Sequence, residues 1–188
     1  MSITLHPTSL PDLFVIEVYP FVDKRGFFLE SYHQRDFAKA GLTETFVQDN
    51  HSRSAAGVVR GLHYQDLTAP MGKLVRCTRG AIFDVAVDLR VGSPTFAQWF
   101  GVELSESNFK QLWVPVGFAH GFATLTEVAE VQYKCTNYYT PAAEGAIRWD
   151  DPQIGVRWPV TAPTLSGRDQ QAPLLADYLS APAFRYTA

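Results

Sequence analysis

Hydrophobic and polar residues alternate along much of this chain, most clearly over residues 81–89. Every second residue from Phe83 to Leu89 is hydrophobic, whereas the residues between them include Asp84 and Asp88. Because successive side chains of a β-strand point to opposite faces, this period of two predicts a strand. One face of that strand carries both carboxylates, so it is a polar-bearing face.

Glycine and proline interrupt the chain about every ten residues, a rhythm typical of many short strands joined by turns. Nine further strands are expected, at 13–19, 27–32, 46–50, 58–64, 73–79, 96–104, 111–114, 120–125 and 130–136. Helix signals are weak and lie at 34–40, which Gly41 would end, and at 173–179. So many short strands predict a mainly β sandwich or barrel with a few short helices.

Composition supports one compact domain over residues 1–188. The chain is 46% hydrophobic and 13% aromatic, which favours strands and is enough to bury a substantial core. A net charge of −3 argues against a nucleic-acid partner. Neither a membrane-length apolar run nor a signal peptide is visible, so a cytoplasmic protein is expected. Cys77 and Cys135 lie in apolar strand-like segments and are expected to be buried reduced thiols.

Two histidines follow patterns that attract attention. His63 comes three residues after Arg60, and in a regular strand these side chains would face opposite ways unless Gly61 marks a bulge or bend. His120 ends the string Pro-x-Gly-x-x-His at 115–120, which matches the second half of the pattern of cupin barrels. Metal-binding cupins have a further histidine where this chain has Gln65, so no metal site is expected. Taken alone, His63 could equally be a hydrogen-bonded core residue.

Three tyrosines lie at the end of the strand predicted over 130–136. Tyr133 alternates with Val131 and Cys135, so it faces inward if they do. A phenol held there could pack against the core or donate a proton to a carbanion. The pattern alone leaves both interpretations open.

Several short strings together resemble the dTDP-4-dehydrorhamnose 3,5-epimerase family, from about residue 10 to 177 and in the family's order and spacing. The strings are Asp-Lys-Arg-Gly-Phe-Phe at 23–28, Phe-Val-Gln-Asp-Asn-His-Ser at 46–52, Arg-Gly-Leu-His-Tyr-Gln at 60–65, Gly-Lys-Leu-Val-Arg-Cys at 72–77, 115–122 and 133–139. The resemblance implies a cupin-type double-stranded β-helix, or jelly roll. It also implies an enzyme that inverts C3 and C5 of dTDP-4-dehydro-6-deoxy-D-glucose, giving dTDP-4-dehydro-L-rhamnose.

The family's motifs imply four catalytic roles in this chain. His63 would be the base and Tyr133 the acid, with Lys73 beside the developing enolate oxygen and Asp169 orienting the histidine. The residue types suit these roles, because an imidazole with a pKa of about 6.5 is largely neutral at neutral pH and a phenol near 10 keeps its proton. Neither a metal nor an organic cofactor is implied.

The remaining implied residues bind the substrate. Arg25, Arg60 and Arg168 would hold the diphosphate, where close relatives often have lysine at the position of Arg168. The nucleotide and sugar contacts implied are Phe27, Glu30, Gln48, Asn50, His120, Tyr139 and Glu144. An arm carrying Arg25, Phe27 and Glu30 would cross to a neighbouring subunit, which implies a homodimer with shared sites.

Three alternatives remain. A single-centre epimerase, acting at C3 or C5 only, would share the same base, acid and nucleotide contacts. A non-catalytic cupin that binds a nucleotide sugar would lack the base or the acid. A metal-dependent cupin oxygenase would lose its activity on chelation.

Overall fold

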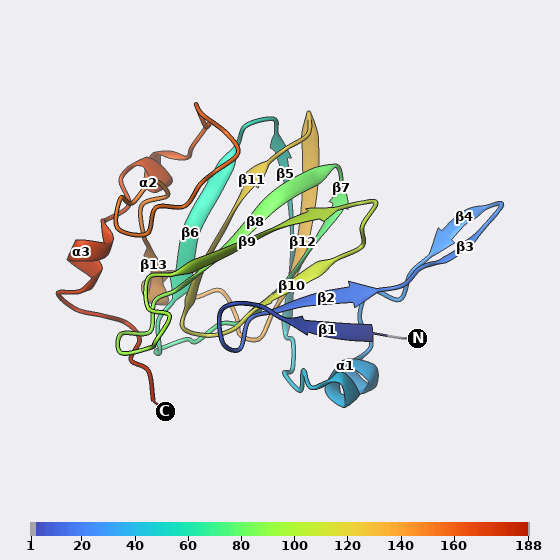
Figure 1. Ribbon diagram of the computed structural model, residues 1–188, viewed down its shortest axis with the longest axis horizontal. Helices are drawn as coiled ribbons and strands as arrows, with labels where there is room; N and C mark the ends of the chain where they lie inside the picture. The colour runs from blue at the N-terminus through green and yellow to red at the C-terminus, as the bar shows by residue number, and fades with distance from the viewer. Residues whose placement is uncertain (1–2, 188) are drawn as a thin grey trace.

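The computed structural model describes residues 3–187 and arranges the chain as two facing antiparallel sheets with an extended hairpin (Figure 1). The six-stranded sheet has the order β1 (Ile3–Pro7), β2 (Phe14–Val18), β10 (Gln111–Val114), β7 (Lys73–Arg79), β12 (Val128–Cys135) and β5 (Gln48–Ala55). The five-stranded sheet has the order β13 (Glu144–Ala146), β6 (Val59–Gln65), β11 (Phe118–Thr124), β8 (Ala81–Asp88) and β9 (Trp99–Ser105). The predicted mainly β class is confirmed.

The core between the sheets is the barrel interior, and it explains the alternation along β8. Ile82 and Ala86 are fully buried there with Val75 and Leu112 of the opposite sheet. Asp84 is on the same inward face, so the polar-bearing face predicted for this strand looks into the barrel. A barrel interior that contains a fully buried carboxylate is a candidate location for an active site.

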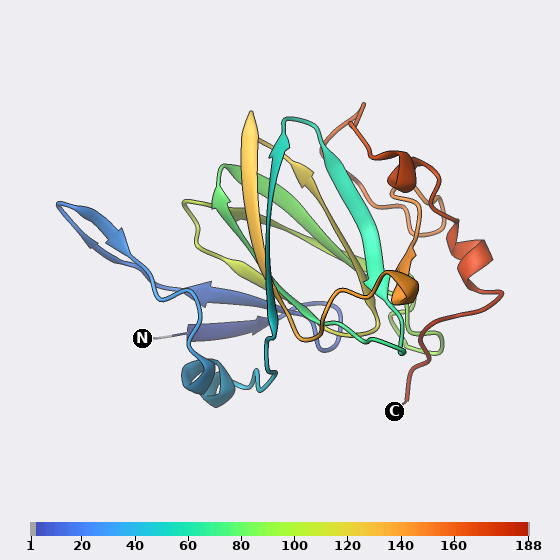
Figure 2. The same cartoon turned by 180° about the vertical axis from the view of Figure 1, so that it is seen from behind.

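Two further hydrophobic clusters lie on the outer faces of the sheets. Figure 2 shows the backbone segments beside these faces, with the C-terminal segment on one side of the body and the helix that follows the arm on the other. The C-terminal part of the chain, with α2 (Gly167–Gln170) and α3 (Leu175–Tyr178), packs Leu175 and Tyr178 against the five-stranded sheet. Helix α1 (Gln34–Ala40) packs Phe37 against the six-stranded sheet and ends at Gly41, as predicted, with a left-handed φ of 110°. A short turn of 3-10 helix, η1 (Pro141–Ala143), precedes β13.

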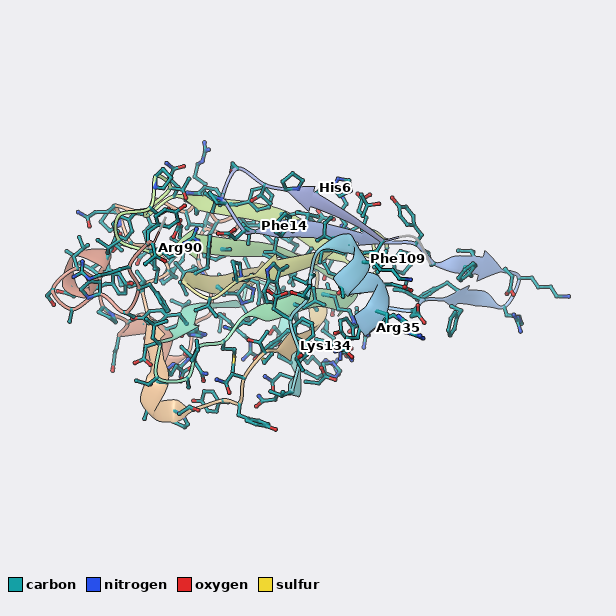
Figure 3. All side chains as sticks on the ribbon, turned by 90° about the horizontal axis from the view of Figure 1, so that it is seen from below. His6, Phe14, Arg35, Arg90, Phe109 and Lys134 are labelled. Carbon is teal, nitrogen blue, oxygen red and sulfur yellow. The ribbon has the colours of Figure 1, made fainter. Side chains whose placement is uncertain are left out.

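The largest error of the sequence prediction is the strand expected at 27–32. Only β4 (Gly26–Phe28) is extended there, and it pairs with β3 (Phe21–Asp23) in a hairpin that projects from the body as an arm (Figure 1). Beyond Phe28 the chain no longer pairs as a strand, and the aromatic residues of this region pack on separate neighbours. Phe27 contacts the ring of Phe109, which Figure 3 labels near the base of the arm, and Tyr32 packs on Phe37.

Other boundaries also differ from the prediction. Strand β5 begins at Gln48 and continues to Ala55, whereas 46–50 was predicted. The prediction missed these bounds because the strand is mostly polar on both faces, so hydrophobic and polar residues do not alternate along it. Strand β9 begins at Trp99, since Ser93 and Thr95 lie in turns where their hydroxyls donate to Asp88. Strands β1, β3 and β13 and helix α2 were not predicted.

Cys77 and Cys135 are buried free thiols, which confirms that expectation. Burial raises the pKa of Cys77 to about 11, so this thiol stays protonated and unreactive. Within residues 3–187, no helix combines the length and the apolar character that a membrane crossing requires.

Candidate active site

A pocket of about 460 Å3 opens between the two sheets, and both contribute side chains to it. His63 comes from β6 and His120 from β11 of the five-stranded sheet, whereas Lys73 comes from β7 and Tyr133 from β12 of the six-stranded sheet. Nine predicted site residues line this pocket: Arg60, His63, Lys73, His120, Tyr133, Tyr139, Glu144, Arg168 and Asp169.

A bulge at Gly61 resolves the conflict between Arg60 and His63. The register between β6 and β11 shifts at this point, and both side chains reach the pocket. Gly61 has a φ of 130°, and a Cβ there would lie 2.6 Å from the Cα of Gly121. Only glycine fits both the backbone conformation and this close approach. The predicted bulge is confirmed.

His63 is held by a buried carboxylate. Its Nε2 lies 2.6 Å from Oδ1 of Asp169, whose side chain is only 3% exposed. Ser166 caps α2 by accepting the backbone N–H of Asp169, which fixes the carboxylate's position. Burial alone would raise the pKa of Asp169, but the hydrogen bond and charge of His63 lower it overall. The carboxylate therefore stays ionised and sets the orientation of the imidazole.

Lys73 is half-buried, and its ammonium group lies in the same pocket. Burial lowers its pKa, against the opposing influence of Cys135, Glu144 and Asp84. Its Nζ donates to the backbone oxygen of His63 at 3.5 Å. An ammonium group with one long hydrogen bond can still bind a developing negative charge strongly, because the surroundings are poorly solvated.

Tyr133 extends into the pocket from the sheet opposite His63. Burial raises its pKa, while the nearby amide of Asn50 and the charge of Arg60 act to lower it. The phenol is therefore protonated at neutral pH and faces a site whose other wall carries an imidazole. This arrangement can remove a proton on one side of a bound molecule and return one on the other.

Known proteins resemble the chain over nearly its whole length. The dTDP-4-dehydrorhamnose 3,5-epimerase of Salmonella typhimurium is 56% identical over 170 residues, which cover 89% of this chain and 93% of that protein. The crystal structure of dTDP-6-deoxy-D-glucose-3,5-epimerase from Legionella pneumophila, in complex with dTDP-4-keto-L-rhamnose, matches with a TM-score of 0.95 and 46% identity, covering 100% of both chains. The sequence pattern of the dTDP-4-dehydrorhamnose 3,5-epimerases matches residues 7–177.

The chain belongs to the dTDP-4-dehydrorhamnose 3,5-epimerase family. The expected cupin-type barrel and the expected activity, 3,5-epimerisation of a dTDP-4-keto sugar, are confirmed with it. A dTDP-4-dehydrorhamnose 3-epimerase of Streptomyces niveus is also similar, at 40% identity over 174 residues, which cover 92% of this chain and 84% of that protein. This identity is lower than that to the Salmonella 3,5-epimerase.

A polar network lies at the pocket of the epimerase where a charged ligand would enter. Glu144 accepts hydrogen bonds from the hydroxyl of Tyr139, at 2.8 Å, and from Nη1 of Arg168. Burial would raise the pKa of Glu144, but these two partners lower it overall. Arg60 donates from Nε to the hydroxyl of Ser54 at 3.0 Å, which holds its guanidinium at the pocket.

Five predicted site residues do not line this pocket. Gln48 and Asn50 lie on the inner face of β5, next to Tyr139 and Tyr133 respectively. Arg25 is at the tip of the arm, where it pairs with Asp23 and its side chain is 84% exposed. Phe27 is in the arm and Glu30 follows it. Within one chain the arm does not reach His63, so its role stays a prediction.

Sequence reasoning missed the second carboxylate–imidazole pair of the epimerase. Asp84 is fully buried, and its Oδ1 lies 2.8 Å from Nε2 of His120. The signal was present, because an aspartate on the inward face of an otherwise hydrophobic strand needs a partner. Ser52, Phe122, Thr164, Leu165 and Ser166 also line the pocket and were not predicted.

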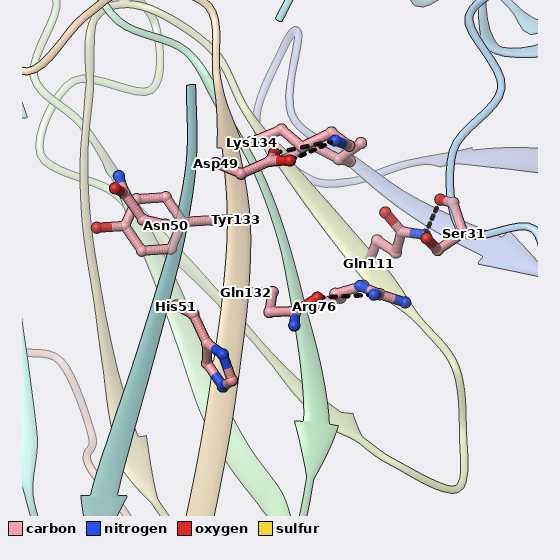
Figure 4. A pocket seen from close by; sticks show the side chains of 10 residues that line it. Ser31, Asp49, Asn50, His51, Arg76, Gln111, Gln132, Tyr133 and Lys134 are labelled. Atoms are coloured by element: carbon pink, nitrogen blue, oxygen red, sulfur yellow. Dashed lines mark hydrogen bonds and ion pairs between the residues drawn. The ribbon is translucent and has the colours of Figure 1, made fainter. Parts of the chain in front are cut away.

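A second pocket, of about 360 Å3, lies at the outer face of the six-stranded sheet (Figure 4). Arg76 donates to Gln132 there, and Lys134 pairs with Asp49. Most of its lining side chains are polar, and Asn50 and Tyr133 also border it. Within residues 3–187, no three His, Cys, Asp or Glu side chains are grouped to hold a metal ion.

Asp169→Asn is expected to slow epimerisation by about a hundredfold while leaving dTDP affinity nearly unchanged. The amide keeps the shape of the side chain but presents a different hydrogen-bond pattern to His63 and no longer stabilises an imidazolium. Steady-state kinetics and calorimetric titration with dTDP measure the two quantities. Equal losses of rate and dTDP affinity would contradict an orienting role.

Proposed function

We propose that His63 and Tyr133 invert the substrate carbons by proton transfer across the pocket. His63 removes a proton from the carbon beside the C4 ketone, and Tyr133 delivers a proton to the opposite face. The observation that carries this proposal is that the two side chains come from opposite sheets and line one pocket. Because C3 and C5 both flank the ketone, the same pair serves both carbons in turn.

Lys73 stabilises the enolate that forms at the ketone oxygen. Its buried ammonium group has a single long hydrogen bond, to the backbone oxygen of His63, so it can reorient toward an oxyanion. Asp169 holds the imidazole and stabilises the imidazolium formed after proton abstraction. No step needs a metal or an organic cofactor, so chelation with EDTA is expected to leave the rate unchanged.

Substrate binding combines arginine and aromatic contacts. Arg60 and Arg168 hold the diphosphate, and Arg168 must exchange its bond to Glu144 for one to a phosphate oxygen. Tyr139 stacks on the thymine, while Gln48, Asn50 and His120 bind the nucleoside and sugar. Tyr139 is half exposed at the pocket, as a stacking residue requires.

The epimerase forms a homodimer in which the arm of one subunit completes the site of the other with Arg25, Phe27 and Glu30. Support comes from the arm itself, a hairpin that projects from the body and leaves four large apolar side chains more than half exposed: Phe21, Val22, Phe27 and Phe28. Monomeric proteins rarely leave so many large apolar side chains in water. The reduced thiols and the nucleotide-sugar substrate support a cytoplasmic location.

Light scattering is expected to give twice the chain mass of 21.0 kDa. Phe27→Asp, which charges the apolar arm, should raise the KM for the sugar nucleotide. Lys24→Ala, a change at the same hairpin without loss of apolar surface, is the matched control. A monomer with full activity would rule out a shared site.

Double inversion is tested by NMR with dTDP-4-dehydro-6-deoxy-D-glucose in deuterated water. Solvent deuterium is expected at both C3 and C5 of the product, with both centres inverted. Deuterium and inversion at one carbon only would assign the chain to the single-centre epimerases. No turnover with this substrate would contradict the proposed function as a whole.

A further inference from the structure

Asn50 lies directly across the β5–β12 ladder from Tyr133, and Gln48 lies across from Cys135. All four side chains belong to the inward face of these strands. Figure 4 shows Asn50 and Tyr133 on one side of the two strands, while Asp49 extends to the other. The neighbour of the proposed acid is therefore a side-chain amide, whose two ends differ chemically.

A backbone group determines which end of the Asn50 amide faces β12. The N–H of Tyr139 can only donate, and it donates to Oε1 of Gln48 at 3.0 Å. The Nε2 of Gln48 therefore points the other way and donates to Oδ1 of Asn50 at 3.1 Å. Because Oδ1 of Asn50 faces Gln48, Nδ2 faces β12, where it donates to Sγ of Cys135 at 3.5 Å.

This orientation has a chemical consequence for the phenol. An amide nitrogen cannot accept a hydrogen bond, so the phenol oxygen must be the acceptor in a bond to the Nδ2 end of Asn50, which faces β12. A phenol that accepts from Asn50 keeps its own proton free for the substrate. The same bond stabilises the tyrosinate that remains after the proton leaves, which agrees with the influence of Asn50 in lowering the pKa of Tyr133.

We propose that Asn50 is a positioning residue that donates Nδ2–H to the Tyr133 oxygen, in an orientation fixed by Gln48 and the Tyr139 backbone, and so keeps the phenol proton directed at the substrate carbon. This inference rests on the proposed acid role of Tyr133. It adds a function for Gln48 and Asn50 beyond contact with the ligand. Their amides form a relay from a backbone N–H to the acid.

Asn50→Asp tests the proposal, because it keeps the shape of the side chain and replaces the donor by an acceptor, to which the phenol O–H would then donate instead of pointing at the substrate. In deuterated water, inversion is expected to fall about tenfold to a hundredfold. Exchange of the substrate's own proton without inversion should continue, because His63 still removes protons and returns them to the same face. Asp49→Asn is the matched control, since this neighbour faces outward and pairs with Lys134; both rates should stay at wild-type values.

The outcomes separate three cases. A selective loss of inversion with retained exchange supports the proposal. A parallel fall of exchange and inversion would show that Asn50 is only a ligand contact, and unchanged inversion would also overturn the positioning role. Tyr133→Phe tests the underlying assignment separately: inversion at the wild-type rate in that variant would refute Tyr133 as the acid, whatever Asn50 does.

A second measurement needs no substrate. NMR of isotope-labelled tyrosine rings follows the titration of Tyr133, whose signal is assigned by its absence in Tyr133→Phe. Gln48→Glu removes the donor to Asn50, so the Asn50 amide should flip and present its oxygen to the phenol, raising the pKa of Tyr133. The rise is expected to be larger with Asn50 present than in an Asn50→Leu background. Equal rises in both backgrounds would show that the new charge acts alone and would contradict the relay.

Discussion

His63→Asn is expected to abolish both inversion and hydrogen exchange at C3 and C5, lowering both rates by about a thousandfold or more. Without the imidazole of His63, His120 is the other imidazole that lines the pocket, and that ring is tied to Asp84. The bond to Asp169 comes from Nε2, the far nitrogen of the ring, so the shorter asparagine also removes the partner of the buried carboxylate. NMR in deuterated water measures inversion and exchange in one experiment.

The matched control for this variant is His51→Asn. His51 is an exposed histidine on the outward face of β5, where it pairs with Glu130, so its loss should leave both rates unchanged. Calorimetric titration should show that His63→Asn still binds dTDP with nearly wild-type affinity, because the arginines are intact. Continued exchange in His63→Asn would assign the base to another group, and His120 would be the next to test.

Sequence patterns predicted most of the strands but failed at one that lines the site. Alternation and the spacing of glycine and proline located most of the strands and gave some boundaries correctly, as at β7 and β10. Alternation failed at β5, where polar residues occupy both faces because the inward face belongs to the site. A hydrophobic pattern identifies residues that avoid water, so it misplaces strands that line a polar cavity.

The site itself was predictable only in part, and for a physical reason. The conflict between Arg60 and His63 predicted the bulge at Gly61, since backbone geometry follows from local sequence. The catalytic roles required the family resemblance, because a single histidine or tyrosine in a strand is consistent with simple packing. The bond between Asp84 and His120 joins two strands distant in sequence, and only the folded barrel brings them together.

Lys73→Met is expected to reduce inversion and exchange together, by about a hundredfold to a thousandfold. Both processes pass through the same enolate, and the variant removes the charge that stabilises its oxygen. A common loss distinguishes Lys73 from Tyr133, whose removal should affect inversion alone. Unequal losses in Lys73→Met, with exchange preserved, would contradict the enolate role. Lys134→Met, a change at an outward-facing lysine paired with Asp49, is the control and should keep both rates.

The same variant is expected to be more stable than the wild type at neutral pH, on the order of 1 kcal/mol in the free energy of unfolding. Burial lowers the pKa of Lys73 below its ordinary value of 10.5, so the unfolded chain binds this proton more tightly than the folded one. The cost of the buried charge is complete below the lowered pKa. It declines as pH rises toward 10.5, where the unfolded lysine also loses its proton.

The stability gained by Lys73→Met should therefore shrink between the lowered pKa and pH 10.5, which urea unfolding at several pH values would measure. A gain that did not depend on pH would mean that Lys73 is not held as a buried cation.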